Sequence, residues 1–301
     1  MSTAADLRRL LAGDDIVVAP GVYDGLSARI AAAAGFSAVY CSGGAVARST
    51  GLPDLGLLTM TEVLARLREV IDATTLPVIA DADTGYGNAV SVVRTVREFE
   101  RLGAAAIHIE DQVAPKKCGH YSGQELISAE EMVQKLRAAL DTRSEMLIIA
   151  RTDARGKAGL GEAIRRGRMY ADAGADIIFV EAPTSRAEIE TIAHSITAPL
   201  LVNMFEGGRT PLIPAAELAA MGYRLMVVPS DLQRGAIRAM QRVAEALRRD
   251  GSSAAVRDQL ASFNERDAIV NLAAWSELDS RYAESNAPAA SREEDREIGT
   301  D

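Results

Sequence analysis

Short runs of β-branched and apolar residues alternate with longer segments of helical period along most of this chain, and this rhythm limits the folds that it can adopt. We predict strands over 15–19, 38–41, 77–81, 106–110, 146–151, 176–181, 199–203 and 224–228. We predict amphipathic helices over 60–73, 88–102, 128–141, 159–173, 185–195 and 231–249. Strands that alternate with helices form a parallel sheet, and eight of them favour a closed (β/α)8 barrel of the TIM type over residues 1–250.

An open, doubly wound sheet is the alternative arrangement of the same elements. It would usually contain fewer strands, and its dinucleotide-binding members carry a G-x-G-x-x-G fingerprint. The glycines at 43–44 and those at 85 and 87 do not have that spacing. The barrel is therefore the preferred fold class, and a chain of 301 residues accommodates it as a single domain.

Two segments follow the predicted barrel. Residues 251–283 have helical character, with apolar side chains at positions such as Phe263, Leu272 and Trp275. We expect this helical segment to pack on the barrel or on a neighbouring subunit, because its apolar positions need a partner. Residues 284–301 are charged and of low complexity, so we expect a disordered acidic tail.

The charge balance and the cysteine count exclude several classes of function. The chain has 42 acidic and 33 basic residues, and this net charge of −9 argues against nucleic acid or an anionic membrane as a partner. Two cysteines cannot build a disulfide framework, and the first residues lack the pattern of a secretory signal. No apolar run approaches the roughly 20 residues that cross a bilayer. We therefore expect a cytoplasmic protein.

Polar residues follow most of the predicted strands. The strand ends carry Ser42, Gly43 and Gly44, then Asp81 and Asp83, Glu110, Arg151, Glu181 and Asn203. Helix capping accounts for some of these residue types. In a (β/α)8 barrel, however, the active site lies at the carboxyl ends of the strands, so the set predicts one polar site there.

Asp81 and Asp83 are the most specific pair at these strand ends. A spacing of two places both carboxylates on one face of a strand, where they repel each other unless a cation or a proton lies between them. A site made of oxygen ligands indicates Mg²⁺, or Mn²⁺, rather than zinc. Glu110 shares a face with His108, so Glu110 is a candidate outer ligand and His108 a candidate for orienting its neighbours.

The segment after the fourth strand places Cys118 among basic residues. Lys116, Lys117 and His120 would lower the pKa of this thiol, which suits a proton donor or a nucleophile. Gly119 lies in the same segment, whose glycines allow it to close over a ligand. Arg151 offers a planar fork for a carboxylate, and the glycines at 43–44 let backbone N–H groups approach an anion.

Together these motifs resemble the isocitrate lyase/phosphoenolpyruvate mutase superfamily, in its branch of short lyases that cleave 2-methylisocitrate or 2,3-dimethylmalate. The resemblance is carried by YCSGG, GLPDLG, DADTGYG, IEDQ, KKCGH, ARTDA, EAP and NMFEGG, and it covers about residues 15–250. It implies a (β/α)8 barrel and a homotetramer whose paired subunits exchange the eighth helix. Two stretches depart from the methylisocitrate lyase pattern, MFEGG after Asn203 and a longer eighth loop at 229–240.

The resemblance also implies roles for individual residues. Asp81 and Asp83 match the Mg²⁺ carboxylates, with Asp54 and Glu110 assisting through water. Cys118 matches the proton donor and Tyr40 a tyrosine near the reacting hydroxyl, while Lys116, Lys117 and His120 supply positive charge. The positions that match substrate contacts are Ser42, Gly43, Gly44, Asp81, Gly119, His120, Arg151, Glu181 and Asn203.

The expected function is a Mg²⁺-dependent carbon–carbon lyase. It would split a small 2-hydroxy di- or tricarboxylate between C2 and C3 into pyruvate and an enediolate, which Cys118 protonates. One alternative is other chemistry on the same site, namely oxaloacetate hydrolysis or decarboxylation, or a phosphonomutase reaction of the carboxyphosphonoenolpyruvate type. A barrel that binds an oxo acid without catalysis is the other alternative, and the filled catalytic positions argue against it.

Overall fold

The computed structural model describes residues 3–119 and 123–284. The chain divides into two compact units, residues 1–257 and 258–301, which we describe separately. The acidic tail predicted over 284–301 lies beyond Glu284 outside the described residues.

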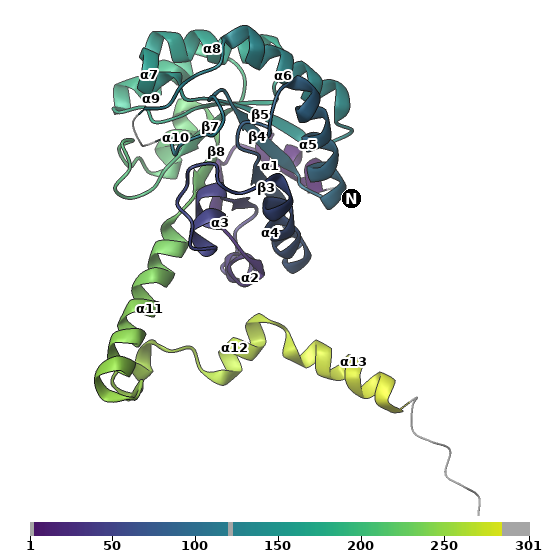
Figure 1. Ribbon diagram of the computed structural model, residues 1–301, viewed down its shortest axis with the longest axis vertical. Coiled ribbons are helices and arrows are strands. Elements are labelled where there is room, and N and C mark those ends of the chain that lie inside the picture. Colours follow the sequence, from purple (N-terminus) through teal and green to yellow (C-terminus); the bar gives the residue numbers. More distant parts are fainter. Residues whose placement is uncertain (1–2, 120–122, 285–301) are drawn as a thin grey trace, which may run out of the picture. The chain divides into compact units, whose positions relative to one another are not determined.

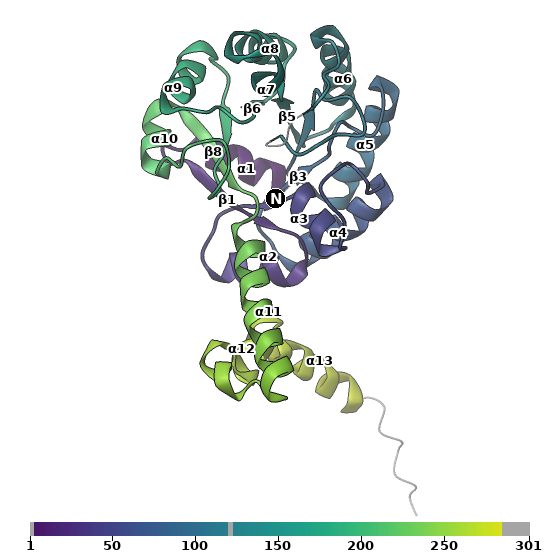
Figure 2. The ribbon, with the colours of Figure 1, turned by 60° about the vertical axis from the view of Figure 1, so that its left-hand side comes forward.

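The first unit is a closed barrel of eight parallel strands, as the strand–helix rhythm predicts (Figures 1 and 2). The strands are β1 (Val17–Val22), β2 (Val39–Cys41), β3 (Val78–Asp81), β4 (Ala106–Glu110), β5 (Leu147–Thr152), β6 (Ile177–Val180), β7 (Leu200–Asn203) and β8 (Tyr223–Val228). Each strand pairs with the next, and β8 pairs with β1 from Val17–Leu225 to Pro20–Val228, which closes the sheet.

The α-helices of this unit surround the barrel, except that the last one projects away from it (Figure 2). They are α1 (Thr3–Leu11), α2 (Gly25–Ala33), α3 (Gly43–Ser49), α4 (Met60–Ala73), α5 (Ala89–Leu102), α6 (Ala129–Thr142), α7 (Ala154–Ala158), α8 (Leu160–Asp172), α9 (Arg186–Ser195), α10 (Ala215–Met221) and α11 (Asp231–Asp250). The six predicted helices are confirmed to within one residue at each end. The residues predicted as a long eighth loop, 229–240, instead mostly form the start of α11.

Strand alternation sets which side chains face the site. On β4, Ile107 and Ile109 lie in the apolar layer between strands and helices, whereas Ala106 belongs to the apolar cluster inside the barrel. His108 and Glu110 share the inward face with Ala106, and both are fully buried. The barrel interior thus changes from apolar to ionisable toward the carboxyl ends of the strands.

The first strand differs most from its prediction. It was expected to end before Pro20 but continues through Pro20 and Gly21 to Val22. Gly21 pairs with Tyr40, and a Cβ atom on it would lie 2.2 Å from the carbonyl oxygen of Pro229. A glycine that looks like a turn residue in the sequence is therefore used for close backbone packing inside the barrel.

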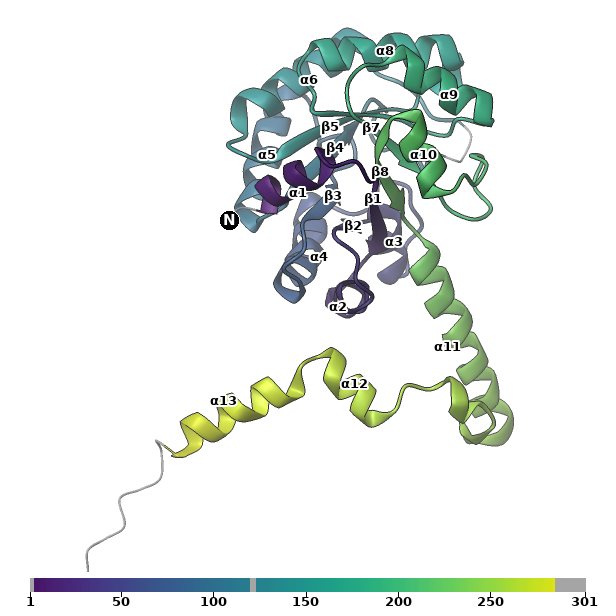
Figure 3. The ribbon, with the colours of Figure 1, turned by 180° about the vertical axis from the view of Figure 1, so that it is seen from behind.

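Helix α1 closes the amino-terminal end of the barrel (Figure 3). Its residues Ala4 and Leu7 are buried in the same apolar cluster as Val17, Ile79 and Leu147. A site that is open to substrate must therefore lie at the opposite, carboxyl end of the strands.

The second unit contains two short helices in its described residues, α12 (Phe263–Ile269) and α13 (Leu272–Glu284). Ser262 and Glu265 form a capping box that starts α12. Phe263 and Trp275 are 74% and 65% exposed. In the described part of the whole chain, no helix combines the length and apolar character that crossing a membrane requires.

Candidate active site

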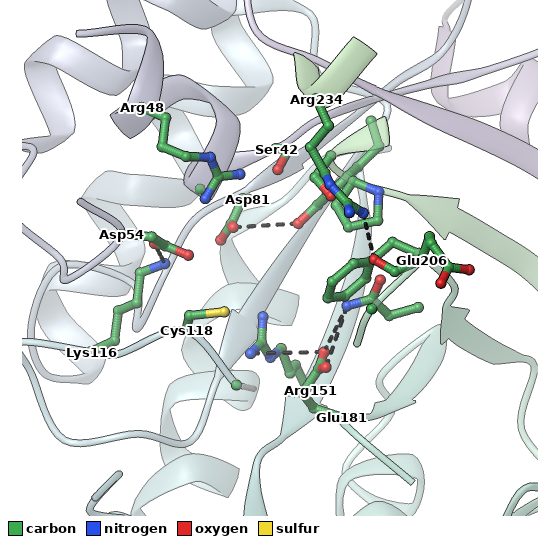
Figure 4. Close-up of a pocket in the computed structure, with 18 of the residues that line it drawn as sticks. Ser42, Arg48, Asp54, Asp81, Lys116, Cys118, Arg151, Glu181, Glu206 and Arg234 are labelled. Carbon is green, nitrogen blue, oxygen red and sulfur yellow. Dashed lines mark hydrogen bonds and ion pairs between the residues drawn. The ribbon is translucent and has the colours of Figure 1, made fainter. Parts of the chain in front are cut away.

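A cavity of about 490 Å³ opens at the carboxyl ends of the strands (Figure 4). Its lining residues come from strand ends, from the loops that follow them and from the start of α11. They are Tyr40, Ser42, Gly44, Arg48, Asp54, Asp81, Lys116, Cys118, Gly119, Arg151, Glu181, Asn203, Phe205, Glu206, Gly207, Pro229, Ser230, Arg234 and Ile237. Most of the residues predicted to form the site therefore lie around one cavity.

Lys116 is surrounded by the carboxyl groups that were predicted to hold a cation. Its Nζ atom lies 2.5 Å from Asp54 Oδ1 and 2.9 Å from Asp83 Oδ1. The side chain is 5% exposed. Burial lowers the pKa of Lys116, but the negative charges of Asp83, Asp81 and Asp54 outweigh that effect and raise it, so the ammonium stays charged.

The prediction that Asp81 and Asp83 lie on one face of a strand is wrong. Strand β3 ends at Asp81, and Asp83 lies in the following turn with φ at 46°, so the two side chains do not share a strand face. The turn instead lets the N–H of Asp83 donate to Asp81 Oδ1 over 3.0 Å, and it directs the Asp83 carboxylate to Lys116.

The carboxyl groups of this cluster fit a divalent cation with oxygen ligands. Both carboxylate oxygens of Glu110 are buried without a hydrogen-bond partner among the described residues. Within those residues, no three His, Cys, Asp or Glu side chains stand close enough to hold a metal ion by themselves. Mg²⁺ suits such a set, because it keeps several water ligands and takes only one or two carboxylates.

The pKa values of the carboxyl groups also indicate that this cluster has too little positive charge to ionise fully. Burial raises the pKa of Glu110 well above its ordinary value, and it raises the pKa of Asp83 to about 6. Burial raises the pKa of Asp81, but the charges of His108, which is protonated only at acidic pH, and of Lys116 and Arg151 outweigh it and lower that pKa. A bound cation would allow all of these carboxyl groups to ionise together.

Arg151, at the end of β5, is held by three acidic side chains. It makes a two-point contact with Asp153, from Nε to Oδ2 over 3.0 Å and from Nη2 to Oδ1 over 2.9 Å. Its Nη1 lies 3.2 Å from Glu110 Oε2, and its Nη2 lies 3.8 Å from Glu181 Oε2. Asn203 Nδ2 donates to Glu181 Oε1 over 3.3 Å. Arg151, Glu181 and Asn203 therefore form one polar wall of the cavity, in which Figure 4 shows Arg151 beside Glu181.

Asp111 supports this wall from behind, although it does not line the cavity. Its Oδ1 accepts the backbone N–H of Asp153, and its Oδ2 accepts from Thr152, Arg166 and Tyr170 over 2.8 to 2.9 Å. Asp111 is fully buried. This network fixes the segment that carries both Arg151 and its partner Asp153.

Tyr40 lines the cavity beside Asp81, and the fully buried His108 contacts both of them. The Tyr40 hydroxyl donates to Asp81 Oδ2 over 3.3 Å and lies 2.8 Å from His108 Nε2. Burial lowers the pKa of His108 to about 4 and raises that of Tyr40 well above its ordinary value. Both groups are therefore neutral near pH 7.

Two glutamine side chains hold the segment that carries Cys118. Gln112 accepts from the Lys117 N–H and donates to the Lys117 carbonyl, and Gln124 donates to the carbonyls of Cys118 and Gly119. Figure 4 shows the Cys118 sulfur directed into the cavity between Lys116 and Arg151. Sequence analysis missed both glutamines, because no spacing signal distinguishes an amide that binds a backbone from an exposed one.

Lys117 and His120 were both predicted to supply positive charge at the site. The structure places Lys117 outside the cavity, exposed, with its ammonium donating to the Gly123 carbonyl, because Gln112 fixes its backbone. Lys117 was predicted to supply positive charge at the site, and its position outside the cavity argues against that role. His120 lies outside the described residues.

Ser42, Gly43 and Gly44 start a helix rather than a loop. The Ser42 side chain accepts from Ala45 N at the start of α3. The Gly43 N–H donates to Asp81 Oδ2 over 3.2 Å, and a Cβ atom on Gly43 would lie 2.5 Å from the same oxygen. These glycines therefore allow the helix to start against Asp81, at the edge of the cavity.

Gly119 leads to a prediction, because it has no space for a side chain. A Cβ atom there would lie 2.4 Å from Glu181 Cγ and 2.7 Å from both Arg151 Nη2 and Asp153 Oδ1. We expect Gly119→Ala to displace the polar wall and lower kcat/KM about 100-fold, since small misplacements of reacting groups have effects of that order. Gly161→Ala, where nothing lies within 4 Å, is the control, and equal activity of both variants would contradict this role.

Sequence analysis missed two arginines of the cavity. Arg48 lies at the end of α3 and Arg234 in the first turn of α11, far apart in the chain. Their only sequence signal was that Arg234 belongs to the stretch 229–240, which departs from the family pattern.

Comparison with known proteins gives consistent matches over nearly the whole chain. Residues 7–248 match the sequence profile of the phosphoenolpyruvate phosphomutase family. The 2,3-dimethylmalate lyase of Eubacterium barkeri is 48% identical over 94% of this chain and 99% of its own length. The 2-methylisocitrate lyase of Aeropyrum pernix is 45% identical over 92% of this chain and 89% of its own length.

Solved structures agree with the sequence matches. An oxaloacetate acetylhydrolase bound to 3,3-difluorooxalacetate superposes with a TM-score of 0.88 at 36% identity, over 94% of this chain and 97% of that one. A phosphonopyruvate hydrolase in complex with oxalate and Mg²⁺ superposes with a TM-score of 0.86 at 31% identity, over 94% of this chain and all of that one.

Proposed function

This chain belongs to the isocitrate lyase/phosphoenolpyruvate mutase superfamily, and we propose that it is a Mg²⁺-dependent lyase that splits a 2-hydroxy di- or tricarboxylate into pyruvate and a second carboxylate. Relatives that are named lyases over most of the chain support the class, a carbon–carbon lyase. One observation carries the proposal. The Cys118 thiol faces the same cavity as Arg151 and the carboxyl groups around Lys116.

Asp81 and Asp83 would hold the cation, with Asp54 and Glu110 acting through water. A bound Mg²⁺ would lower the pKa of the substrate's C2 hydroxyl and offset the negative charge that develops there. The Mg²⁺ complex of the phosphonopyruvate hydrolase supports this choice of ion. Lys116 keeps two of these carboxylates in place, because its ammonium contacts both Asp54 and Asp83.

The remaining residues would orient the substrate. Ser42, Gly43 and Gly44 lie where the oxo-acid end would bind, and Tyr40 lies next to Asp81, where its hydroxyl can orient the C2 oxygen. Arg151, with Glu181 and Asn203, would bind the carboxylate of the other fragment, because a guanidinium makes a planar match to a carboxylate.

The reaction would then need one proton transfer onto carbon. The C2 hydroxyl loses its proton, its oxygen becomes the carbonyl of pyruvate, and the C2–C3 electron pair moves onto the departing carboxylate. The Cys118 thiol gives its proton to C3, and the thiolate recovers a proton from solvent. Lys116 and Arg151 would stabilise the negative charge during this step.

Hydrolysis of oxaloacetate is a second candidate, because the oxaloacetate acetylhydrolase superposes closely on this chain. A direct test incubates the protein and Mg²⁺ with 2,3-dimethylmalate, 2-methylisocitrate or oxaloacetate, and measures pyruvate with lactate dehydrogenase and oxalate separately. Pyruvate from either hydroxy acid, abolished by EDTA and restored by Mg²⁺, supports the lyase. Oxalate from oxaloacetate without pyruvate from the hydroxy acids would support the hydrolase.

We also propose a cytoplasmic homotetramer in which paired subunits exchange α11. Met240 and Leu247 of α11 are 61% and 48% exposed, so this helix has apolar surface that a second copy could cover. Light scattering after size-exclusion chromatography is expected to give four times the chain mass of 32.0 kDa. A concentration-independent mass of one chain would contradict the proposed assembly.

A further inference from the structure

We infer that Arg48 and Arg234 form a second anion-binding subsite at the cavity and that it binds a carboxylate on the C3 substituent of the substrate. This inference rests on the proposed lyase function. It narrows the substrate to a 2-hydroxy tricarboxylate, because a C3-methyl dicarboxylate has no group for this subsite. In Figure 4 the two guanidinium groups lie on either side of Ser42, while Arg151 lies across the cavity.

Arg48 is held in place by a buried glutamine of α11. Gln233 is 5% exposed, and its Oε1 accepts from Arg48 Nε over 2.8 Å. Its Nε2 donates to the Ala45 carbonyl over 2.8 Å. A carbonyl oxygen can only accept and the Arg48 Nε–H can only donate, so the Gln233 amide must present its NH₂ group to Ala45 and its oxygen to Arg48. The Nε of Arg48 is thereby used, and its two terminal nitrogens remain for a ligand.

Arg48 differs from Lys116 and Arg151 in having no carboxylate partner among the described residues. Lys116 has carboxylate partners in Asp54 and Asp83, and Arg151 has Asp153. In the described part of the chain, no carboxylate lies within 4.0 Å of the Arg48 guanidinium. Asp54 Oδ2 and Arg48 Nη1 would lie 2.7 and 3.3 Å from a Cβ atom on Gly44, and the other oxygen of Asp54 accepts from Lys116.

Arg234 approaches from the first turn of α11. It donates from Nη1 to the carbonyl of Glu206, in the loop after β7, and lies 3.5 Å from Asp231 Oδ1. A backbone carbonyl and one exposed carboxylate therefore hold the Arg234 guanidinium. Because an exposed ion pair is weak, most of the positive charge of Arg234 remains available to a ligand in the cavity. Arg48 and Arg234 line the same cavity because β8 closes on β1.

Two carboxylates are common to every substrate of the proposed reaction, one on C2 and one on C3. The start of α3 and the polar wall around Arg151 are already assigned to them. A second pair of guanidinium groups therefore matches an additional carboxylate. Arginine binds carboxylates through charge-assisted hydrogen bonds, which contribute about 1.5 to 3 kcal/mol each and correspond to roughly 10- to 100-fold in affinity.

The test compares kcat/KM for 2-methylisocitrate and 2,3-dimethylmalate in the full chain, with Mg²⁺ present. The unaltered protein is expected to prefer the tricarboxylate. Arg48→Gln is expected to lower kcat/KM for the tricarboxylate at least tenfold more than for the dicarboxylate, and Arg48→Lys to recover part of the loss. Arg238→Gln, one turn beyond Arg234 on α11 and outside the cavity, is expected to leave both values unchanged.

Binding of the two products, measured by calorimetry with Mg²⁺, separates this inference from the lyase proposal. Succinate is expected to bind at least tenfold more tightly than propionate, and Arg48→Gln to remove the difference. Preference for the dicarboxylate, an equal loss for both substrates in Arg48→Gln, or equal binding of succinate and propionate would overturn the subsite while leaving the lyase in place. Failure to cleave either substrate would overturn the lyase, and the succinate measurement would still decide the subsite.

Discussion

Cys118→Ala is expected to lower kcat for pyruvate release about 10²- to 10⁴-fold, because it removes the only group that we assign to protonate the departing fragment. The thiol is partly exposed at the cavity, so its loss leaves no large void in the core. The melting temperature is therefore expected to stay the same. Binding of pyruvate with Mg²⁺, measured by calorimetry, is also expected to persist, since the residues assigned to it are unchanged.

Cys41→Ala is the matched control for this experiment. Cys41 is buried in the apolar layer outside the barrel, and burial raises the pKa of its thiol to about 12, so it stays protonated and inert. Its replacement is expected to lower stability but to leave most of the catalysis. Full turnover in Cys118→Ala would show that another group protonates the product.

Arg151→Met is expected to cause both a loss of activity and a loss of stability. Arg151 contacts Asp153, Glu110 and Glu181, so its removal leaves buried carboxylates without a counter-charge. Breaking a buried ion pair from one side costs about 3 to 5 kcal/mol, or roughly 6 to 20 °C in melting temperature for a unit of this size. Activity is expected to fall at least 100-fold. Arg151→Lys keeps the charge and is expected to recover part of the stability.

The stability loss of Arg151→Met is expected to grow with pH. Burial already raises the pKa of Asp153 and Arg151 lowers it, so removing the arginine raises it further. A carboxyl group whose folded pKa lies above its unfolded value destabilises the fold once pH exceeds the unfolded value, about 3.9. The difference in melting temperature between Arg151→Met and the parent should therefore be larger at pH 8 than at pH 5. Arg165→Met, at an exposed pair, should show no such trend, and parallel melting curves for Arg151→Met would refute this account.

The strand–helix rhythm predicts the barrel well, because each element carries its own hydrophobic period. It fails where the barrel environment overrides local preference. Pro20 and Gly21 resemble a turn, yet they continue β1, since the strand needs a residue without a side chain against Pro229. Similarly, Gly43 and Gly44 resemble a loop, yet Ser42 caps a helix there. Such positions are decided by neighbours that are distant in the sequence.

The residues of the site also divide into those that local sequence pattern places and those that distant neighbours place. Asp81 and Arg151 lie in strand ends and Glu181 comes directly after β6, so the positions of these side chains could be predicted from the strands. Lys117 could not, because only the contact with Gln112 decides which of the two adjacent lysines faces the cavity. The arrangement of Arg48 through Gln233 depends on closure of the barrel, which brings residues 185 positions apart into contact.

The most direct test of the central claim follows the products in D₂O by NMR, with 2-methylisocitrate and 2,3-dimethylmalate as substrates. With Mg²⁺, each substrate molecule that is consumed should give one pyruvate and one second carboxylate. That second carboxylate should carry a single deuterium on the carbon that was C3 of the substrate. EDTA should stop both signals together. Absence of pyruvate from both substrates, or a carboxylate product without deuterium at that carbon, would contradict the proposed cleavage and its protonation by an exchangeable acid.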